Sequence, residues 1–407
     1  MNIDEARAAE LRDKLADELK TAGYIKSAPV EAAFRTVSRH AFVPADTPLD
    51  VTYHVDSAVV TKRDEHGIAI SSVSAAYIQV AMIEQAELEP GMTVLEIGSG
   101  GVNAAMIAEI VGADGHVVSV DIDEAVAERA AELLDANGYA DRVSVMAVDA
   151  EHEIPTFEQF DATIVTVGAW DLSPAWLRQL APDGTLVVPM RMNGVSRSIA
   201  FRRTNDHLAS TSAVVCGFVP MQGAGRHIDR EFRLPDANGH AVALRFDDGA
   251  PDDPALLDGV LASERSEVWS GVTIKHGVSF ADLHLWFASF LPGFCRLAVD
   301  EGTELAQERK SWFPFAGVRG DSFAYLSVRP ALEGAGAEFG ARAYGPHGQE
   351  AATAMVEQIR AWDEQARNRP EPTFAYWPTG YTPADLPEGT AALHKTHGLV
   401  TISWPTG

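Results

Sequence analysis

The stretch that decides the fold is VLEIGSGG, residues 94–101, an apolar run that ends in a glycine-rich turn. An acid, Glu96, stands two positions before the first glycine, and a helix is expected after the turn. Glycines at such a turn let the backbone approach a ligand closely and leave the amino end of the next helix open to it. The stretch therefore predicts a strand, a turn and a helix that form a ligand site; a turn without a ligand is the simpler alternative.

This stretch is the first of five short runs that are rich in β-branched residues. They are TVLEIG (93–98), HVVSVD (116–121), RVSVMAVD (142–149), DATIVTV (161–167) and GTLVVPM (184–190). Each has the length of a buried parallel strand, and the segments between them are long enough for crossover helices. The pattern predicts an α/β fold, a Rossmann-like doubly wound sheet.

The chain is long enough, at 407 residues, to favour more than one domain. Two more strand-like pieces, SRSIAFRRT (196–204) and SAVVCGFVP (212–220), precede a change of composition at residues 221–225. We place a boundary there. Residues 1–225 are expected to form the sheet domain with its N-terminal helices, and residues 226–407 a C-terminal α+β accessory domain.

Several segments outside the central runs also carry a pattern. Apolar positions at helical spacing predict a helix over residues 4–23 and a second one ending near Val37, whereas residues 42–70 read as an irregular loop. Beyond residue 226 the expected strands are HAVALRF, FAYLSVRP and LVTISW, and the expected helices are ALLDGVLAS, ADLHLWFASF and EAATAMVEQIRAWDEQA.

Charge and cysteine content exclude several classes of protein. The formal net charge is -26, from 58 acidic and 32 basic residues, and it would repel a nucleic acid backbone. The two cysteines, Cys216 and Cys295, lie in apolar stretches, as buried reduced thiols do. The N-terminus is charged and no run of 18 apolar residues occurs. We expect a cytoplasmic protein without nucleic acid, membrane span or metal.

The glycine turn favours one kind of nucleotide over another. Dinucleotide-binding turns of the form G-x-G-x-x-G need a third glycine, and this chain has Asn103 at that place. A site for S-adenosylmethionine has no pyrophosphate to bind, and an acid such as Glu96 can lie near its cationic methionine end. The turn therefore predicts S-adenosylmethionine as the cofactor and S-adenosylhomocysteine as the product, with an oxidoreductase as the rival.

Two further acids end the next predicted strands. Asp121 follows Gly98 at a separation on the order of 20 residues, at which a carboxylate accepts hydrogen bonds from ribose hydroxyls. Asp123 competes for this role, although it also suits the N-cap of the next helix. Asp149 is expected to bind the exocyclic amine of adenine, with the backbone amide of Ala150 beside it; taken alone, Asp149 is as consistent with an exposed loop.

The chain also resembles the protein-L-isoaspartate O-methyltransferase family in a series of blocks in order. These are RTVSRHAFVP (35–44), SSVSAAY (71–77), AELEPGMTVLEIGSG (86–100), FDATIVTVGAWDLSPAWLRQLAPDGTLVVPM (160–190) and CGFVPM (216–221). The strings VTKRDEHG (60–67), GSGGVNAA (98–105) and VTVGAWD (165–171) resemble the subgroup encoded beside lanthipeptide precursors, the FxLD-type methyltransferases.

The resemblance implies a serine at the methyl-transfer centre, in the family pattern I-S-x-P-H/Y-M. Ser74 falls on it when Tyr77 is aligned with the His/Tyr position, and Ala76 then replaces the proline. Ser71 and Ser72 are nearby competitors. The expected cofactor-binding residues are Ser72, Val73, Tyr77, Glu96, Gly98, Ser99, Gly100, Asn103, Asp121, Ile122, Asp149, Ala150 and Thr166.

The substrate that the resemblance implies is a polypeptide with an aspartyl or isoaspartyl carboxylate. The subgroup implies an aspartate of a modified lanthipeptide, esterified and then converted through a succinimide to isoaspartate; the alternative is repair of isoaspartate in damaged proteins. Lys62, Arg63, His66 and Gln222 are candidate substrate-binding residues, although the first three also suit a solvated loop and the last a linker. The C-terminal domain is expected to select the peptide. A module that binds peptide without turnover is the non-enzymatic rival.

Overall fold

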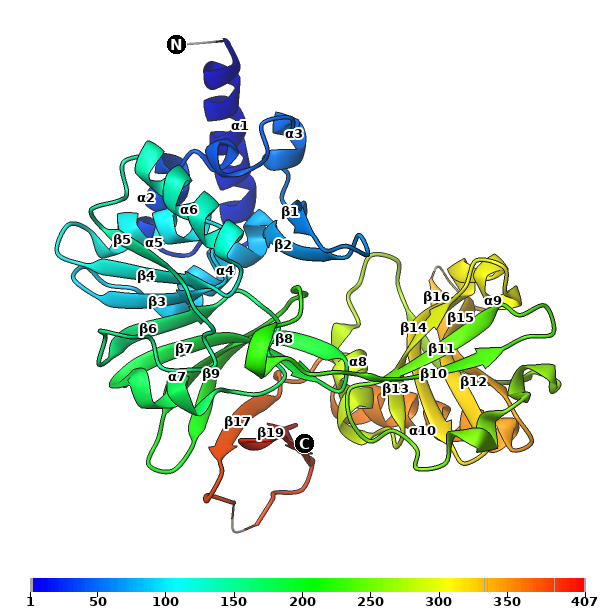
Figure 1. Cartoon of the computed structure of the whole chain (residues 1–407). Coiled ribbons are helices and arrows are strands. Elements are labelled where there is room, and N and C mark those ends of the chain that lie inside the picture. Colours follow the sequence, from blue (N-terminus) through cyan, green and yellow to red (C-terminus); the bar gives the residue numbers. More distant parts are fainter. Residues whose placement is uncertain (1–2, 333, 335, 384, 406–407) are drawn as a thin grey trace.

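The computed structural model describes residues 3–332, 334, 336–383 and 385–405. A ten-stranded sheet forms the larger half of the molecule, on the left in Figure 1. Its strands, in spatial order, are β18 (Thr390–His394), β19 (Gly398–Ser403), β17 (Thr373–Pro378), β9 (Leu208–Val215), β8 (Val195–Arg203), β7 (Leu180–Met192), β6 (Phe160–Val165), β3 (Thr93–Ile97), β4 (His116–Asp121) and β5 (Val143–Ala147).

The five strands from β5 to β7 are parallel, and the others run antiparallel to their neighbours. β3 is fully buried from Val94 to Ile97, as a strand covered on both faces must be. Its neighbours are β4 and β6. The strands β4 and β5 extend the sheet to one side of β3, and the later strands β6 and β7 extend it to the other side, so the strand order switches at β3. Ligands of open α/β sheets bind at the carboxyl ends of strands at such a point. The doubly wound α/β prediction is confirmed.

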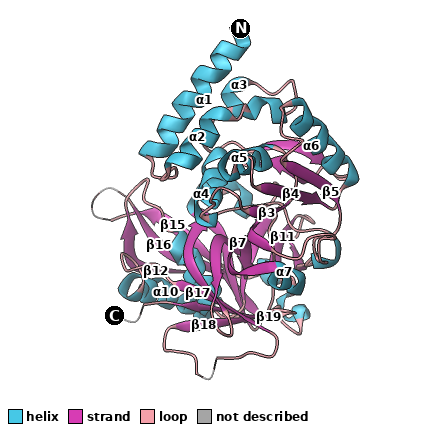
Figure 2. Cartoon of the chain, turned by 90° about the vertical axis from the view of Figure 1, so that its left-hand side faces the viewer, coloured by secondary structure: helices cyan, strands magenta, loops and turns pink. Residues whose placement is uncertain are grey.

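Helices cover both faces and one end of this sheet (Figure 2). They are α1 (Ile3–Thr21), α2 (Ala28–Thr36), α3 (Leu49–Thr52), α4 (Ala76–Ala86), α5 (Val102–Val111), α6 (Glu124–Ala136) and α7 (Pro174–Gln179). α4 contacts β6, β7 and β8, while α5 contacts β3, β4 and β5. In the part of the chain that the structure describes, no helix is both long enough and apolar enough to cross a membrane.

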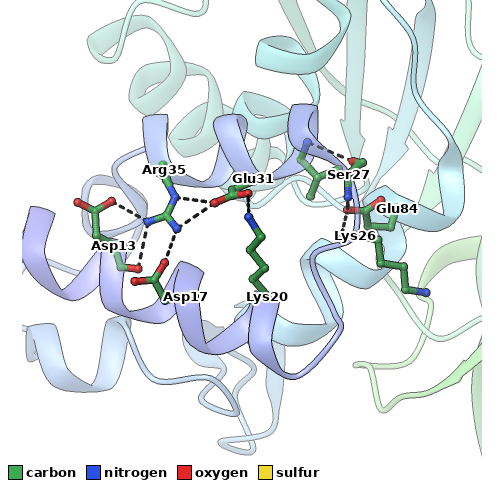
Figure 3. Close-up of polar contacts among 9 residues, drawn as sticks. Asp13, Asp17, Lys20, Lys26, Ser27, Glu31, Arg35 and Glu84 are labelled. Carbon is green, nitrogen blue, oxygen red and sulfur yellow. Dashed lines mark hydrogen bonds and ion pairs between the residues drawn. The ribbon is translucent and has the colours of Figure 1, made fainter.

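Polar contacts join the N-terminal helices to α4 (Figure 3). Arg35 of α2 pairs with Asp13 and Asp17 of α1 and with Glu31 of its own helix. At the start of α2, both backbone amides of Lys26 and Ser27 donate to a carboxylate oxygen of Glu84 on α4, each at 2.8 Å. Single exposed ion pairs contribute about 0–1 kcal/mol, so the buried apolar faces of these helices dominate their packing. The pairs fix the orientation of α4, whose amino end follows Ser74.

Residues 42–70 are more regular than the sequence prediction. They contain α3 and a hairpin of β1 (Val59–Arg63) and β2 (Ala69–Val73), whose turn is the polar string 64–68. The loop prediction was wrong because both strands are only partly buried, so neither has a clear alternation of apolar and polar residues. In Figure 1 this hairpin projects from the sheet's helical end toward the second half of the molecule.

The second half is a seven-stranded antiparallel sheet with one long helix against it. Its strands, in spatial order, are β10 (Arg230–Pro235), β11 (Ala241–Phe246), β13 (Phe294–Val299), β14 (Trp312–Arg319), β15 (Ser322–Pro330), β16 (Ala337–Tyr344) and β12 (Ser266–Ile274). The helices are α8 (Ala281–Phe290), α9 (Glu304–Gln307) and α10 (Gly348–Gln365). The predicted helix at ALLDGVLAS is instead two short 3-10 turns, Pro254–Leu257 and Val260–Ala262, separated by Gly259 at φ 71°.

The predicted unit of residues 226–407 does not stay together as one sheet. Its last strands, β17, β19 and β18, return to the ten-stranded sheet, where β17 pairs with β9. In Figure 1 they lie in orange and red against the green strands. α8 contacts β8 and β18 of one sheet and β13 of the other, and one apolar core runs through both halves. The two halves are therefore joined by shared packing as well as by the chain.

Candidate active site

The glycine-rich turn lies between β3 and α5, where the structure allows no side chain at Gly98. Its φ is +98°, and a Cβ added there would lie 2.5 Å from Oγ1 of Thr166. Thr166, just after β6, donates to the carbonyl oxygens of Gly98 at 2.8 Å and Ile97 at 3.0 Å. The neighbouring strand thus holds the turn in place. Gly101 is the N-cap of α5 and provides no side-chain cap, so the amino end of this helix stays open.

Replacing Gly98 with alanine is expected to weaken binding of S-adenosylhomocysteine by roughly tenfold or more, because the turn has to move away from Thr166. Gly91→Ala is a matched control: its φ is +88°, but no atom lies within 4 Å of the added Cβ. Calorimetric titration of both variants separates the local clash from backbone strain alone. Equal weakening in the two variants would show that the contact with Thr166 is unimportant.

A cleft beside this turn brings together most of the predicted cofactor residues. Ser72, Val73, Ser74, Glu96, Gly98, Ser99, Gly100, Asn103, Asp121 and Thr166 all line it. The same cleft is lined by Ser71, the competitor of Ser74, and by residues that the sequence did not indicate: Ile70, Gln79, Met82, Val102, Val167, Phe218 and Val219. Gln79 and Met82 are three residues apart on α4, and this helical spacing after Ser74 was the available signal.

Glu96 is a fully buried acid on the wall of the cleft. Its Oε2 accepts a hydrogen bond from the hydroxyl of Ser119, which lies 2.8 Å from that of Ser99. Its Oε1, like the side-chain nitrogen of Asn103, is buried with no hydrogen-bond partner among the described residues. Burial raises the pKa of Glu96 to about 7, against the opposing effects of Ser119 and Asn103. Since the Asn103 side chain is close enough to Glu96 to lower its pKa, the two groups form one polar site on the wall of the cleft.

Asp121 and Asp123, the two acids that compete for the ribose role, have different surroundings. The Asp121 carboxylate accepts from the backbone amides of Ser99 at 3.0 Å and Asp123 at 2.9 Å. It lines the cleft, and burial raises its pKa. Asp123 is the N-cap of α6, accepts from the amide of Val126 at 3.1 Å and pairs with Lys62 at 2.6 Å. Asp121 is therefore the acid placed to meet a ligand.

A second cleft continues from the first along the strand ends. It shares Ile70, Gly98, Asp121 and Val167 with the first, and adds the predicted residues Ile122, Asp149, Ala150 and Gln222. Val148, Pro220 and Met221, which the sequence reasoning did not select, line it too. The three acids Glu96, Asp121 and Asp149 therefore follow one edge of the sheet.

Residues 222–225 lie over Asp149. Its Oδ2 accepts from the backbone amide of Ala224 at 2.9 Å, and its Oδ1 accepts from the amide of Glu151 at 3.0 Å. A Cβ on Gly223 would lie 2.4 Å from this carboxylate, so the segment packs tightly. The clear space is only about 40 Å³ in each cleft. The polar groups fit a nucleoside, and we expect this covering segment to move when one binds.

Ser74 lies at the inner end of β2, and a buried arginine holds its backbone. Arg39 donates to the carbonyl oxygens of Ser74 and Thr52 and to the side-chain oxygen of Gln79. Burial lowers the pKa of Arg39 to about 10. The sequence reasoning missed this role, although Arg39 belongs to the block RTVSRHAFVP. Of the competing serines, Ser71 shares a hydrogen bond of 2.8 Å with Thr61, and Ser72 lines the cleft with Ser74.

Tyr77 lines neither cleft, so its assignment as a cofactor residue stays a prediction without support from this geometry. It contacts Tyr24, with ring centroids 5.4 Å apart, on the far side of α4. The reason is helical geometry: Tyr77 and Gln79 are two positions apart, so they point to opposite faces.

The basic residues before the serine loop also lie elsewhere than predicted. Lys62 is engaged with Asp123, Arg63 donates to the carbonyl of Gly67, and His66 is exposed beside Glu65. Arg63 and His66 serve the hairpin and its turn, and neither lines the clefts. Their assignment to the substrate at the transfer centre is therefore not supported.

Comparison with known families agrees with this geometry. Residues 10–226 match the model of the family described as protein-L-isoaspartate(D-aspartate) O-methyltransferase. The chain belongs to this family. It is 33% identical over 237 residues to the protein-L-isoaspartate O-methyltransferase of Hyperthermus butylicus, covering 54% of this chain and 92% of that one. The Methanopyrus kandleri enzyme of the same name is 34% identical over 55% of this chain and 96% of its own.

A solved structure of a protein-L-isoaspartate O-methyltransferase shares the fold more widely. It has a TM-score of 0.50 at 20% identity, and the match covers 89% of this chain and 96% of the other. Because 89% of this chain is more than residues 1–226, at least part of its C-terminal half has a structural counterpart in that protein. The fold is that of class I S-adenosylmethionine-dependent methyltransferases with an additional β-rich region, and the chain is an S-adenosylmethionine-dependent protein carboxyl methyltransferase.

These relatives favour one of the two predicted substrates. They are named for isoaspartate, which fits the repair alternative better than the lanthipeptide-associated subgroup. That subgroup stays a prediction from the strings 60–67, 98–105 and 165–171.

Proposed function

We propose that this methyltransferase esterifies the free α-carboxylate of isoaspartyl residues in proteins or peptides, and that Ser74 orients the acceptor. The observation that carries the proposal is the shared cleft: Ser74 lines the same cavity as Glu96, Gly98 and Asp121. An acceptor beside Ser74 would therefore meet the cofactor's reacting end. The substrate class comes from the family to which residues 10–226 belong.

S-adenosylmethionine supplies, when bound, a methyl group on a positively charged sulfur. We assign Glu96 and Asn103 to its polar methionine end, Asp121 to its ribose and Asp149 to its adenine, because all four residues line the two clefts. Opposite charge favours a carboxylate at Glu96 over its protonated form once a cation lies beside it.

The acceptor needs no general base. An unperturbed carboxyl has a pKa of ~4 and is ionised at neutral pH, so its oxygen can attack directly. That oxygen forms a bond to the methyl carbon while the carbon–sulfur bond breaks, and the electron pair stays on sulfur. Ser74 donates a hydrogen bond to the second carboxylate oxygen and fixes the line of attack. Catalysis is then mainly positioning and the exclusion of water.

The test compares two synthetic peptides that differ only in one residue, isoaspartate or aspartate. We expect transfer of a labelled methyl group to the isoaspartyl peptide and at least a hundredfold lower rate with the aspartyl peptide, since the β-linkage changes the carboxylate's position by a whole methylene. Methylation of the aspartyl peptide alone would overturn the proposal and favour the predicted lanthipeptide reaction. A cytoplasmic location stays a prediction.

A further inference from the structure

The C-terminal half contains a groove that the reaction does not use. It lies between the end of β12, the turn before β14, the end of β15 and the start of β16, and has a volume of about 980 Å³. Its cationic lining residues are Lys275, Arg309, Lys310, Arg329 and Arg342, together with His276. We call this surface the basic groove. Among the described residues that line it, the only acid is Glu308.

The cations of the basic groove form an inner and an outer group. The inner arginines have acid partners: Arg342 lies 2.8 Å from Glu308, and Arg329 lies 2.7 Å from Glu338. Lys275 and Lys310 are exposed and have no ion pair with any described residue. The inner pairs fix the walls, and the outer lysines are available to a ligand.

The floor of the groove is aromatic. Phe280 packs edge-on against Phe313 and Phe339, with ring centroids 4.9 Å and 5.1 Å apart. Phe280 and Phe313 are only partly buried. A chain with net charge -26 that gathers unpaired lysines over partly exposed phenylalanines is complementary to a ligand with both carboxylates and apolar side chains.

A second hollow, of about 740 Å³, lies beside the basic groove but shares no lining residue with it. The loop after β12 contributes to both: Lys275 and Phe280 line the groove, whereas Ser279 lines the hollow. The hollow is also lined by Tyr77 and Val215 of the methyltransferase half. The groove is therefore a separate surface from the cofactor cleft, with which it shares no lining residue either.

We propose that the basic groove binds an acidic segment of the substrate polypeptide, remote in sequence from the methylated residue. The segment carries carboxylates for Lys275 and Lys310 and an apolar side chain for the phenylalanine floor. This inference rests on the proposed function for its polypeptide substrate. It gives the accessory half a role in substrate affinity without a role in the chemistry.

The test uses the full-length chain and isoaspartyl peptides with an acidic tail, a neutral tail or no tail. The double variant Lys275→Glu/Lys310→Glu is expected to raise KM for the acidic-tailed peptide about tenfold with kcat unchanged, and to leave the tail-less peptide unaffected. Lys14→Glu/Lys26→Glu is the matched control, because it makes the same charge change on α1 and the loop that follows it, away from the groove. Added salt should reduce the difference in KM between the acidic-tailed and neutral-tailed peptides in the parent protein, and should have no such effect in the Lys275→Glu/Lys310→Glu variant.

Equal KM values for acidic and neutral tails in the parent protein would overturn the inference. Failure to methylate the tail-less isoaspartyl peptide would instead count against the proposed function. Binding of a labelled acidic peptide without isoaspartate, measured by fluorescence anisotropy, tests the groove independently of methyl transfer. If an RNA oligonucleotide binds more tightly than the acidic peptide, and the Lys275→Glu/Lys310→Glu variant loses this binding, the ligand of the groove is a nucleic acid and the inference is wrong.

Discussion

Glu96→Gln is expected to stabilise the unliganded protein above pH 7 and at the same time to weaken its binding of S-adenosylhomocysteine. The pKa of Glu96 is about 7 in the folded protein against a reference value of 4.5, because the carboxyl is fully buried. Glutamine resembles the protonated acid, keeps the acceptor for Ser119 and carries no charge to bury. The variant therefore removes the cost of an isolated buried charge.

The sign of the pH dependence follows from which state loses its proton first. Between about pH 4.5 and 7 the unfolded chain is ionised at this residue and the folded chain is not, so rising pH favours unfolding. The difference in unfolding free energy between Glu96→Gln and the parent should be small at pH 5 and reach about 1–3 kcal/mol at pH 8. Urea titrations at the two pH values measure it, with exposed Glu89→Gln as the control.

The same substitution removes the anion that we assign to the methionine end of the cofactor. A hydrogen bond to a charged group contributes about 1.5–3 kcal/mol, so affinity for S-adenosylhomocysteine should fall roughly tenfold or more at pH 8. At pH 6 the parent is largely protonated and the two proteins should differ less. A variant that gains stability but binds as tightly as the parent would remove Glu96 from the cofactor site.

Ser74→Ala is expected to lower kcat roughly a hundredfold while leaving binding of S-adenosylhomocysteine and thermal stability unchanged. The hydroxyl has no hydrogen bond to another described residue, whereas the backbone carbonyl, which Arg39 binds, is retained in the variant. Single-turnover transfer of a labelled methyl group measures the step directly.

Ser71→Ala is the matched control, because its hydroxyl pairs with Thr61 on the neighbouring strand. We expect this variant to keep most of its activity. An active Ser74→Ala together with an inactive Ser72→Ala would move the transfer centre to Ser72, which lines the same cleft.

The sequence predicted the strands and the glycine turn that form this edge because their signals are local, whereas the cofactor roles of its residues stay predictions. A buried parallel strand, a glycine turn and an acid at the strand end are each visible in a short window, and parallel strands bring such ends together. Glu96, Asp121 and Asp149 were found in this way. Contacts between distant segments have no such local sign: the pairing of β17 with β9 and the support of Ser74 by Arg39 appear only in the folded chain.

One error has a more specific cause. The β1–β2 hairpin was missed because most of its residues are half-buried and its apolar and polar residues do not alternate. Tyr77 was placed with the cofactor by alignment, and the helix that begins at Ala76 turns its ring away. Helical phase therefore has to be considered before a residue beside a motif is given the motif's role.

The amide of Ala224 occupies the acceptor on Asp149 that an adenine amine would need. Residues 222–226 are also part of the connection, residues 216–229, from β9 of the ten-stranded sheet into β10. A nucleoside that displaces this amide must therefore shift the tether of the whole accessory sheet. Coupling between two binding sites is reciprocal. A polypeptide bound to that sheet should therefore change the affinity for the nucleoside by the same factor by which the nucleoside changes the affinity for the polypeptide. The affinities for cofactor and polypeptide would then be coupled through the segment that connects β9 to β10.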